Sequence, residues 1–231
     1  MKKIRYLVVC LLAMLWLPQT VNAEGCLISA GDPIQTLPGK TITVPVEISG
    51  NPGFTNFGIG LEYDSQQLQL LDIQTVKDNQ PFLCGTNVRT NISWETSQKQ
   101  KMAYITAASA AAVTEQGILF TATFSVPEDF SGSATVTPVV YYLRNNRDPS
   151  KFPSFASVQT GTAGTTVTAV IRGDVNMDGT IEYDDVMLAY KALQNPEILT
   201  QQQIEIADMN RSQVLEETDA KAIYQIYLGG S

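Results

Sequence analysis

The stretch from Gly173 to Asp185 reads Gly-Asp-Val-Asn-Met-Asp-Gly-Thr-Ile-Glu-Tyr-Asp-Asp and has the spacing of a Ca²⁺-binding loop. With Asp174 as position 1, oxygen-bearing side chains stand at positions 1, 3, 5, 9 and 12, namely Asp174, Asn176, Asp178, Glu182 and Asp185. Gly179 at position 6 permits a sharp turn, and the backbone carbonyl of Thr180 at position 7 adds an oxygen. Four carboxylates this close would repel one another without a cation. The alternative is a surface turn rich in Asn, Asp and Gly, but we expect Ca²⁺.

Apolar residues recur at helical spacing after this loop and predict a helix. They are Val186, Ala189, Tyr190 and Leu193. Asn195-Pro196 should end that helix, because proline does not fit a helix interior. Thr200 could then cap a short helix over residues 200–207.

A second loop of the same kind begins 34 residues after the first, at Asp208. Oxygen-bearing side chains again fill positions 1, 3, 5, 9 and 12, namely Asp208, Asn210, Ser212, Glu216 and Asp219. A second helix should follow, closed by Gly229-Gly230, with apolar residues at Ala220, Ile223, Tyr224 and Tyr227. This duplication predicts a small all-α, EF-hand-like calcium domain over residues 172–231, whose two halves bury their apolar stripes against each other.

The preceding segment, from residue 26 to residue 171, alternates apolar and polar residues with period two. Examples are Ile42, Val44, Val46 and Ile48, then Phe57, Ile59, Leu61 and Tyr63. Pro45 interrupts one such run and suggests an edge or a bulge. The small-residue run from Ala107 to Val113 is ambiguous and could form a helical turn or a loop. Many short strands without a convincing helix predict an all-β two-sheet sandwich or jelly roll.

The strands from Gly39 to Leu68 resemble the opening strands of cohesin modules. They run Gly-Lys-Thr-Ile-Thr-Val-Pro-Val-Glu-Ile-Ser-Gly, then Asn-Pro-Gly-Phe-Thr-Asn-Phe-Gly-Ile-Gly-Leu-Glu-Tyr-Asp. The stretch from Gly117 to Val126 is similar to a later core strand of the same modules. The resemblance implies a jelly-roll sandwich related to carbohydrate-binding modules, which recognises dockerins.

The duplicated loop and helix resemble a type I dockerin over essentially all of residues 172–231. By position, the resemblance implies Ca²⁺ ligands from Asp174, Asn176, Asp178, the Thr180 carbonyl and Asp185, with Glu182 acting through water. The corresponding second set is Asp208, Asn210, Ser212, the Val214 carbonyl and Asp219. It departs from the pattern, because Gln213 replaces the glycine and Ser212 replaces a carboxylate. Forcing Gln213 to positive φ would cost roughly 1 kcal/mol or more, so we expect one Ca²⁺ site and a second that binds weakly or is held by hydrogen bonds.

Dockerins contact their partners through loop positions 10, 11, 17 and 18. The resemblance therefore implies partner-binding residues Tyr183, Asp184, Tyr190 and Lys191 in one half. In the other half they are Glu217, Thr218, Tyr224 and Gln225. The two sets differ, so they do not predict two equivalent binding modes.

The N-terminal residues 1–23 have the features of a secretory signal peptide. Lys2, Lys3 and Arg5 precede an apolar run, and Val21-Asn-Ala23 is a cleavage site of small residues. We expect an exported protein, extracellular, at the cell surface or in the periplasm, with domains at 24–171 and 172–231. Its remaining cysteines, Cys26 and Cys84, predict a disulfide in an oxidising compartment, with two buried thiols as the alternative. Cys26 also lies where a lipid-bearing cysteine could stand.

The composition of the chain excludes or disfavours several classes of function. The net charge is −8 and there is no basic stripe, which disfavours nucleic acid as a partner. No histidine is present, which excludes histidine-based catalytic triads and most zinc sites. After the leader, no apolar stretch is long enough to span a membrane.

Three functions remain. The leading one is a noncatalytic assembly or adhesion protein in extracellular polysaccharide utilisation, with cohesin- or dockerin-bearing partners. Another copy of the chain could be the partner, or the two modules of one chain could dock internally. The second is a carbohydrate-binding module with a dockerin tail, whose candidate aromatics are Trp94, Tyr104, Tyr141 and Tyr142. The third is a glycoside hydrolase, which we disfavour because its candidate acids are ordinary for strand ends and loops, namely Glu62, Asp64, Asp72 and Glu95.

Overall fold

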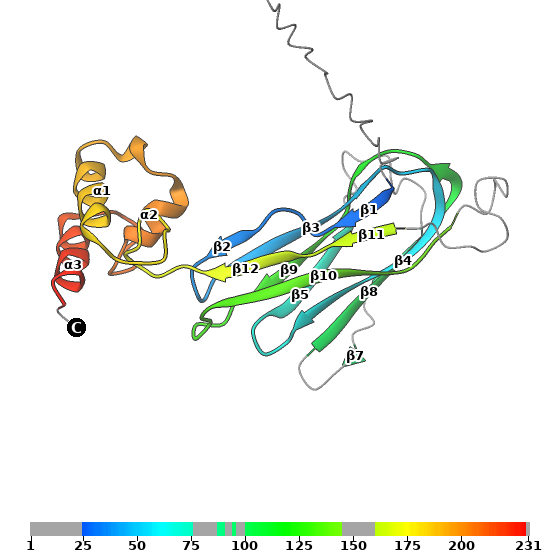
Figure 1. Cartoon of the computed structure of the whole chain (residues 1–231), viewed down its shortest axis with the longest axis horizontal. Helices are drawn as coiled ribbons and strands as arrows, with labels where there is room; N and C mark the ends of the chain where they lie inside the picture. Colours follow the sequence, from blue (N-terminus) through cyan, green and yellow to red (C-terminus); the bar gives the residue numbers. More distant parts are fainter. Residues whose placement is uncertain (1–24, 76–86, 91–93, 96–99, 145–159, 230–231) are drawn as a thin grey trace, which may run out of the picture.

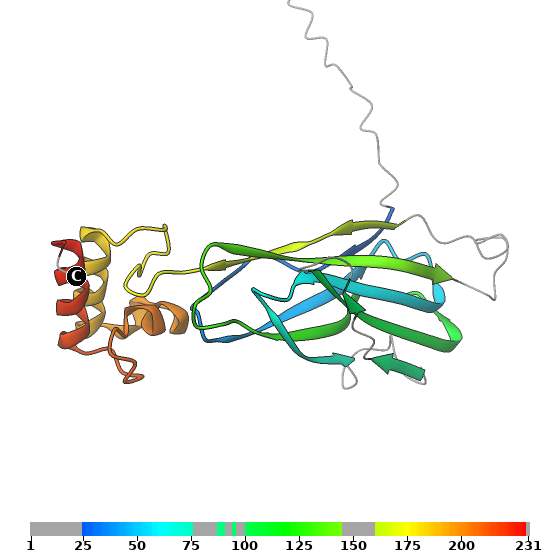
Figure 2. The ribbon, with the colours of Figure 1, turned by 90° about the horizontal axis from the view of Figure 1, so that it is seen from below.

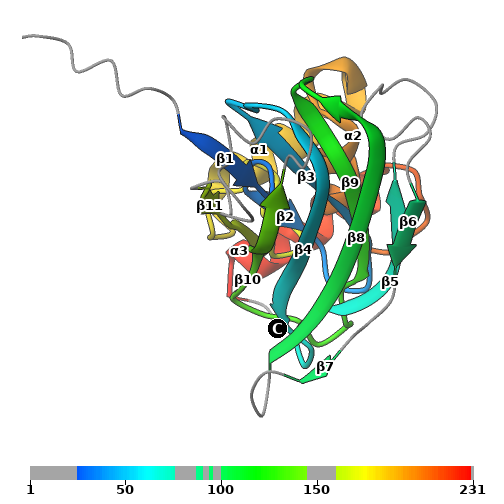
Figure 3. The ribbon, with the colours of Figure 1, turned by 90° about the vertical axis from the view of Figure 1, so that its right-hand side faces the viewer.

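The computed structural model describes residues 25–75, 87–90, 94–95, 100–144 and 160–229. These residues form a β-sandwich followed by a helical module at one end of it (Figure 1). Figure 3 views the molecule from the sandwich side, with the helices behind. The leader over residues 1–23 and Cys84 lie outside the described residues, so the export signal and the disulfide stay predictions.

Within the described residues, one sheet has five strands. Their order across the sheet is β11 (Thr160–Ala163), β1 (Cys26–Ser29), β3 (Thr41–Ser49), β9 (Gly117–Ser125) and β5 (Gln69–Thr75). The pairs β1–β3, β3–β9 and β5–β9 are antiparallel, while β1 and β11 are parallel. Cys26, at the start of β1, is buried, and burial raises the pKa of its thiol to about 11.

The other sheet has seven strands among the described residues. The order is β2 (Ile34–Thr36), β12 (Thr165–Ala169), β10 (Ser133–Arg144), β4 (Phe54–Asp64), β8 (Gln100–Val113) and β6 (Asn87–Thr90), with β7 (Trp94–Glu95) also paired to β8. Strand β4 lies in the middle, antiparallel to both β10 and β8. The two sheets confirm the predicted all-β sandwich.

The alternating residues of facing strands meet in one apolar core. Phe54, Phe57, Phe120 and Phe124 are among its largest fully buried side chains. Tyr63 of β4 packs edge-on against Phe124 of β9, with ring centroids 5.0 Å apart. This contact joins the two sheets, because β4 and β9 belong to different ones. Side chains alternate across a strand, so period-two apolar residues can line this space while their neighbours face outward.

Pro45 lies next to a register shift, as predicted. In β3 it pairs with Thr121 of β9, and the register shifts between Val46 and Glu47. The pairing of β1 with β3 covers only residues 47–49 of β3. Proline therefore occupies a part of the strand where β1 requires no backbone N–H, consistent with its lack of a donor.

The expectation of a helical turn or loop over Ala107–Val113 is wrong. This run is the second half of β8, which pairs with β4 and, at Ala107 and Ala108, with β6. Alanine-rich sequence carries little strand preference of its own, and pairing with neighbouring strands decides the conformation.

The helical module contains three α-helices within the described residues. They are α1 (Tyr183–Gln194), α2 (Gln201–Ala207) and α3 (Glu217–Tyr227), with a 3₁₀ turn, η2 (Pro196–Ile198), between the first two. Helices α1 and α3 pack around buried apolar residues that include Val186, Ala189, Ala220 and Ile223. Figure 2 confirms that α2 lies on the side of the module nearest the sandwich.

The predicted helix ends are largely confirmed. Helix α1 ends before Pro196, and Thr200 caps α2 by accepting from the backbone N–H of Gln203 at 3.2 Å. Gly229 follows α3 with φ +80° and donates to the Ile226 carbonyl at 2.9 Å. The apolar stripe of α3 is shorter than expected, because Tyr224 and Tyr227 are exposed.

Removing the aromatic contact between the two sheets should make the sandwich less stable. We expect Phe124→Ala to lower the free energy of unfolding by about 3–5 kcal/mol, since it removes a fully buried ring and leaves a cavity. Urea unfolding followed by near-ultraviolet circular dichroism measures this. The control is Leu71→Ala on β5, where a half-exposed side chain should cost no more than about 0.5 kcal/mol. Equal losses in both variants would contradict this description of the core.

Candidate calcium loops and partner-binding face

Two buried carboxylates, Asp174 and Asp185, organise the first loop. Asp174 is 1% exposed and accepts hydrogen bonds from the backbone N–H groups of Asp178 at 3.1 Å and Gly179 at 2.8 Å. Asp185 is fully buried and accepts from the backbone N–H of Asn176 at 3.0 Å and from the N-cap residue of α1 at 2.8 Å. The two side chains thus tie the beginning of the loop to its turn and to the following helix.

The middle of the loop is closed by Asp178, which is exposed. Its carboxylate accepts from the amide of Asn176 at 2.8 Å and from both the backbone N–H and the hydroxyl of Thr180, at 3.0 and 2.8 Å. Hydrogen bonds, first from the Thr180 hydroxyl and then from Asn176, lower the pKa of this carboxyl. Glu182 is the N-cap of α1, and its side chain accepts from the backbone N–H of Asp185, completing a capping box.

The electrostatics of the loop favour a cation. Burial raises the pKa of Asp174, the N–H groups of Gly179 and Asp178 oppose this, and the charges of Asp185 and Asp178 raise it further. The ionised form of Asp174 is therefore less stable than that of an exposed aspartate, and an opposite charge close by would stabilise it. Among the described residues, no three His, Cys, Asp or Glu side chains already converge as a metal site. The donors available are nevertheless all oxygens, as a hard cation such as Ca²⁺ requires, so the residues fit the ion.

The second loop repeats the arrangement of the first. Asp208 accepts from the backbone N–H groups of Ser212 at 3.0 Å and Gln213 at 2.7 Å. Asp219 accepts from Asn210 at 3.2 Å and from the N-cap residue of α3 at 2.8 Å. Backbone conformation is shared too, because positive φ occurs at positions 4 and 6 of both loops, namely Met177, Gly179, Arg211 and Gln213. The sequence duplication is therefore also a structural one.

The loops differ where the sequence differs. The Ser212 hydroxyl donates to the Val214 carbonyl at 3.0 Å and accepts from the Val214 N–H at 3.3 Å. That carbonyl is the position-7 oxygen expected to bind the ion. Gln213 stands where the first loop has Gly179, and it adopts φ +69°, the left-handed conformation that was expected at this position. These contacts are those of a loop held by its own hydrogen bonds. The weaker ion binding expected of this loop stays a prediction.

The expected partner-binding residues lie on α1 and α3, at or near the surface. Tyr183, Asp184 and Lys191 of α1 are exposed, whereas Tyr190 is half-buried against the module's core. On α3 all the expected residues are exposed, namely Glu217, Thr218, Tyr224 and Gln225.

Sequence reasoning missed Tyr227, which it assigned to an apolar stripe. The Tyr227 ring lies 6.0 Å from that of Tyr183 and 6.3 Å from that of Tyr224, between centroids. The three rings form an exposed cluster, called here the tyrosine cluster. The corresponding residue of the first half, Leu193, packs against the core, so comparing the two halves would not have predicted the exposure of Tyr227.

The residues considered for sugar binding or hydrolysis lie in both sheets, and only some of them are close together: burial and then the nearby charge of Glu62 raise the pKa of Tyr141. Tyr141 of β10 is exposed and Tyr142 is half-buried, with the Arg144 guanidinium 4.9 Å from its ring centroid. Glu62 and Asp64 lie on β4, while Asp72 lies on β5 in the opposite sheet. For Trp94, Glu95 and Tyr104 only the backbone is described.

Comparison with known families decides what the two modules are. The model of the cohesin domain matches residues 32–146, and that of the dockerin type I domain matches residues 172–226. The chain is a cohesin module followed by a type I dockerin module. Both are noncatalytic assembly modules, and type I dockerins bind calcium.

Solved structures similar to the chain include cohesins and cohesin–dockerin complexes. A non-cellulosomal cohesin from Archaeoglobus fulgidus is 18% identical, with 63% of this chain and 91% of that chain covered and a TM-score of 0.48. A type I cohesin–dockerin complex from Clostridium thermocellum gives 16% identity, 64% and 100% coverage and a TM-score of 0.49. No curated protein matches the chain. Of the helices described, none has the length and apolar character needed to cross a membrane.

Relieving the strained backbone of the second loop should stabilise the dockerin module. We expect Gln213→Gly to raise its free energy of unfolding by about 1 kcal/mol, because glycine adopts positive φ without steric cost. Thermal unfolding followed by far-ultraviolet circular dichroism measures the change. The matched control is Gln213→Ala, which keeps the Cβ and should show no gain. A gain of the same size in both variants would mean that the side chain, and not the backbone, is responsible.

Proposed function

We propose that this is an exported assembly protein that links partners through calcium-dependent cohesin–dockerin recognition in extracellular polysaccharide utilisation. The observation that carries the proposal is the presence of both module types in one chain. The cohesin module is the receptor for a dockerin of one partner, and the dockerin module binds a cohesin of another. A chain with one of each connects two proteins without any catalytic step.

Calcium dependence is supported by the first loop. Asp174, Asn176, Asp178, Asp185 and the Thr180 carbonyl would hold the ion, with Glu182 through water. The ion would neutralise the carboxylates that now depend on backbone N–H groups. In the second loop the ligands would be Asp208, Asn210, Ser212, the Val214 carbonyl and Asp219, at lower affinity. A filled loop would fix the N-terminal ends of the helices that carry the partner-binding residues.

Partner binding is supported by what α1 and α3 leave exposed. Tyr183 and Tyr224 present large aromatic surface, and tyrosine is enriched among residues that dominate binding energy. Asp184, Lys191, Glu217, Thr218 and Gln225 supply polar groups around them, while Tyr190 is half-buried. Export is supported by the leader pattern over residues 1–23, and the polysaccharide context by the resemblance to cellulosome-type modules.

Exchanging the position-5 ligand between the two loops tests the calcium sites. We expect Asp178→Ser to weaken Ca²⁺ binding at the first loop by about tenfold or more, because it removes one of the charged oxygens. Ser212→Asp should strengthen the second loop, since it adds a carboxylate and frees the Val214 carbonyl. Calorimetric Ca²⁺ titration of the full chain, with Mg²⁺ as the control ion, measures both. An unchanged first site in Asp178→Ser would refute the ligand set.

A panel of purified type I cohesin and dockerin modules tests the partner proposal. The full chain should bind a cohesin in Ca²⁺ and release it on addition of a chelator. Tyr183→Ala and Tyr224→Ala should each weaken that binding by roughly 10- to 100-fold, as anchor residues do. Tyr141→Ala is the matched control, because it removes an exposed tyrosine from the sandwich. Cohesin binding that survives in the chelator, or that is lost equally in Tyr141→Ala, would count against the proposal.

A further inference from the structure

The two modules are joined almost without a linker. The Val170 N–H still donates to the Thr36 carbonyl in the sandwich, at 2.9 Å, and the Gly173 N–H already donates to the Ile206 carbonyl in α2, also at 2.9 Å. Only Ile171 and Arg172 lie between these two fixed points. The Arg172 guanidinium in turn donates to the carbonyls of Glu205 and Asp208. The backbone is therefore hydrogen-bonded on both sides of the two-residue connection between the modules.

An apolar contact joins the two modules beside this connection. Leu37 from the sandwich, Val170 at the end of the last strand and Ile206 of α2 form one buried cluster, with Met177 of the first loop packed against it. Ile206 is fully buried and Leu37 is 4% exposed. The cluster is separate from the cores of the sandwich and of the helical module. Its burial therefore depends on the two modules staying together.

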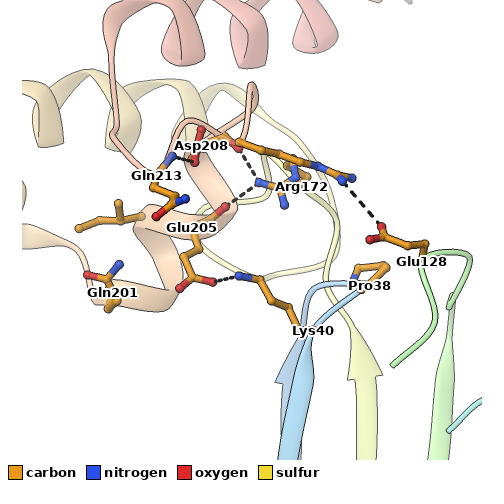
Figure 4. Close-up of a pocket in the computed structure, with 11 residues that line it drawn as sticks. Pro38, Lys40, Glu128, Arg172, Gln201, Glu205, Asp208 and Gln213 are labelled. Atoms are coloured by element: carbon orange, nitrogen blue, oxygen red, sulfur yellow. Dashed lines mark hydrogen bonds and ion pairs between the residues drawn. The ribbon is translucent and has the colours of Figure 1, made fainter. Parts of the chain in front are cut away.

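Polar contacts surround this cluster. Lys40 pairs with Glu205 at 2.6 Å, as Figure 4 shows, and the Gln202 amide donates to the Gln35 carbonyl at 2.7 Å. On the other side Arg211 of the second loop lies 3.7 Å from Glu128. The pocket drawn in Figure 4 is lined by these charges, and each of the charges named here already has an opposite partner. The pocket thus belongs to the contact between modules rather than to a ligand site.

The sandwich side of the contact is held in shape by its own turn. Gly39 has φ +79°, and its N–H donates to the Val126 carbonyl at 3.0 Å. A Cβ at this position would collide with the Glu128 carboxylate. The turn from Leu37 to Lys40 therefore presents its side chains to α2 from a conformation that glycine makes possible.

We propose that this contact, called here the joint, fixes the dockerin module end-on to the sandwich and directs the face formed by α1 and α3 away from it. Figures 1 and 2 both show α2 toward the sandwich and α1 and α3 on the far side. Two residues of connection cannot carry that face back to the strands of its own sandwich. Resting on the proposed function, this means that the dockerin face binds only a cohesin on another molecule, so the chain links in trans.

Nuclear magnetic relaxation of the ¹⁵N-labelled full chain tests the joint. Amides of α1 and α3 should tumble with the same correlation time as those of the sandwich strands. Leu37→Asp, which places a charge in the apolar cluster, should shorten the correlation time of the helices by about twofold, as expected for a much smaller independent body. Leu71→Asp is the matched control, since the same change on an exposed leucine should leave one common correlation time.

Exchanging the charges of Lys40 and Glu205 provides a second test, in case Leu37→Asp fails to fold. Lys40→Glu and Glu205→Lys each place like charges at the 2.6 Å pair, and each should loosen the helices on the same measure. The double variant restores opposite charges and should restore common tumbling. All these positions lie away from the partner-binding residues, so binding to the cohesin panel should persist in every variant.

Two results would overturn the joint. One is a helical module that already tumbles faster than the sandwich in the unsubstituted chain. The other is common tumbling that survives both Leu37→Asp and the single charge reversals. Loss of cohesin binding in a chain that still tumbles as one body would instead count against the proposed function, so the two failures are distinguishable.

Discussion

Carboxylates at the two ends of each loop hold the helical module together. Asp174 and Asp185 in the first loop, and Asp208 and Asp219 in the second, are at most 5% exposed and accept backbone N–H groups from within their own loop. A buried carboxylate is costly unless donors surround it. The turning backbone of the loop and the first turn of the next helix supply those donors, so one side chain both shapes the loop and starts the helix. Removing the charge would therefore disturb both.

This dependence reflects the size of the module. The sandwich buries large rings, such as Phe57 and Phe120, in a continuous core. The helical module buries mainly alanine and valine, with Ile223 as one of its larger side chains. Small domains bury a smaller fraction of their surface and often require a metal ion to be stable. A cation in the loop would supply stability that the small apolar core of the module lacks.

The sequence predicts best the features that repeat locally. Alternation in β3 and β4 is enough to place Val44 and Ile59 in the core, and loop spacing alone finds Asp174 and Asp185. Prediction fails where a distant partner decides the outcome. The Ala107–Val113 run is a strand because β4 lies beside it.

Exposure of Tyr227 likewise depends on how α1 and α3 cross, and the contact of Lys40 with Glu205 joins residues far apart in the chain. No local pattern carries such information. The loop geometry of Gln213 was predictable because a turn imposes its φ regardless of what lies around it.

The surface formed by α1 and α3, on the side away from the sandwich, carries different side chains at its two ends. The tyrosine cluster occupies one end, where α1 begins and α3 stops. At the opposite end, where α3 begins, Glu217 pairs with Lys221 at 2.8 Å. The internal duplication relates the backbones of the two halves, but the side chains at corresponding positions differ. Tyr183 corresponds to Glu217, and Leu193 corresponds to Tyr227. A partner surface complementary to one end would meet different chemistry at the other, so the duplication of the fold does not extend to the side chains on this surface.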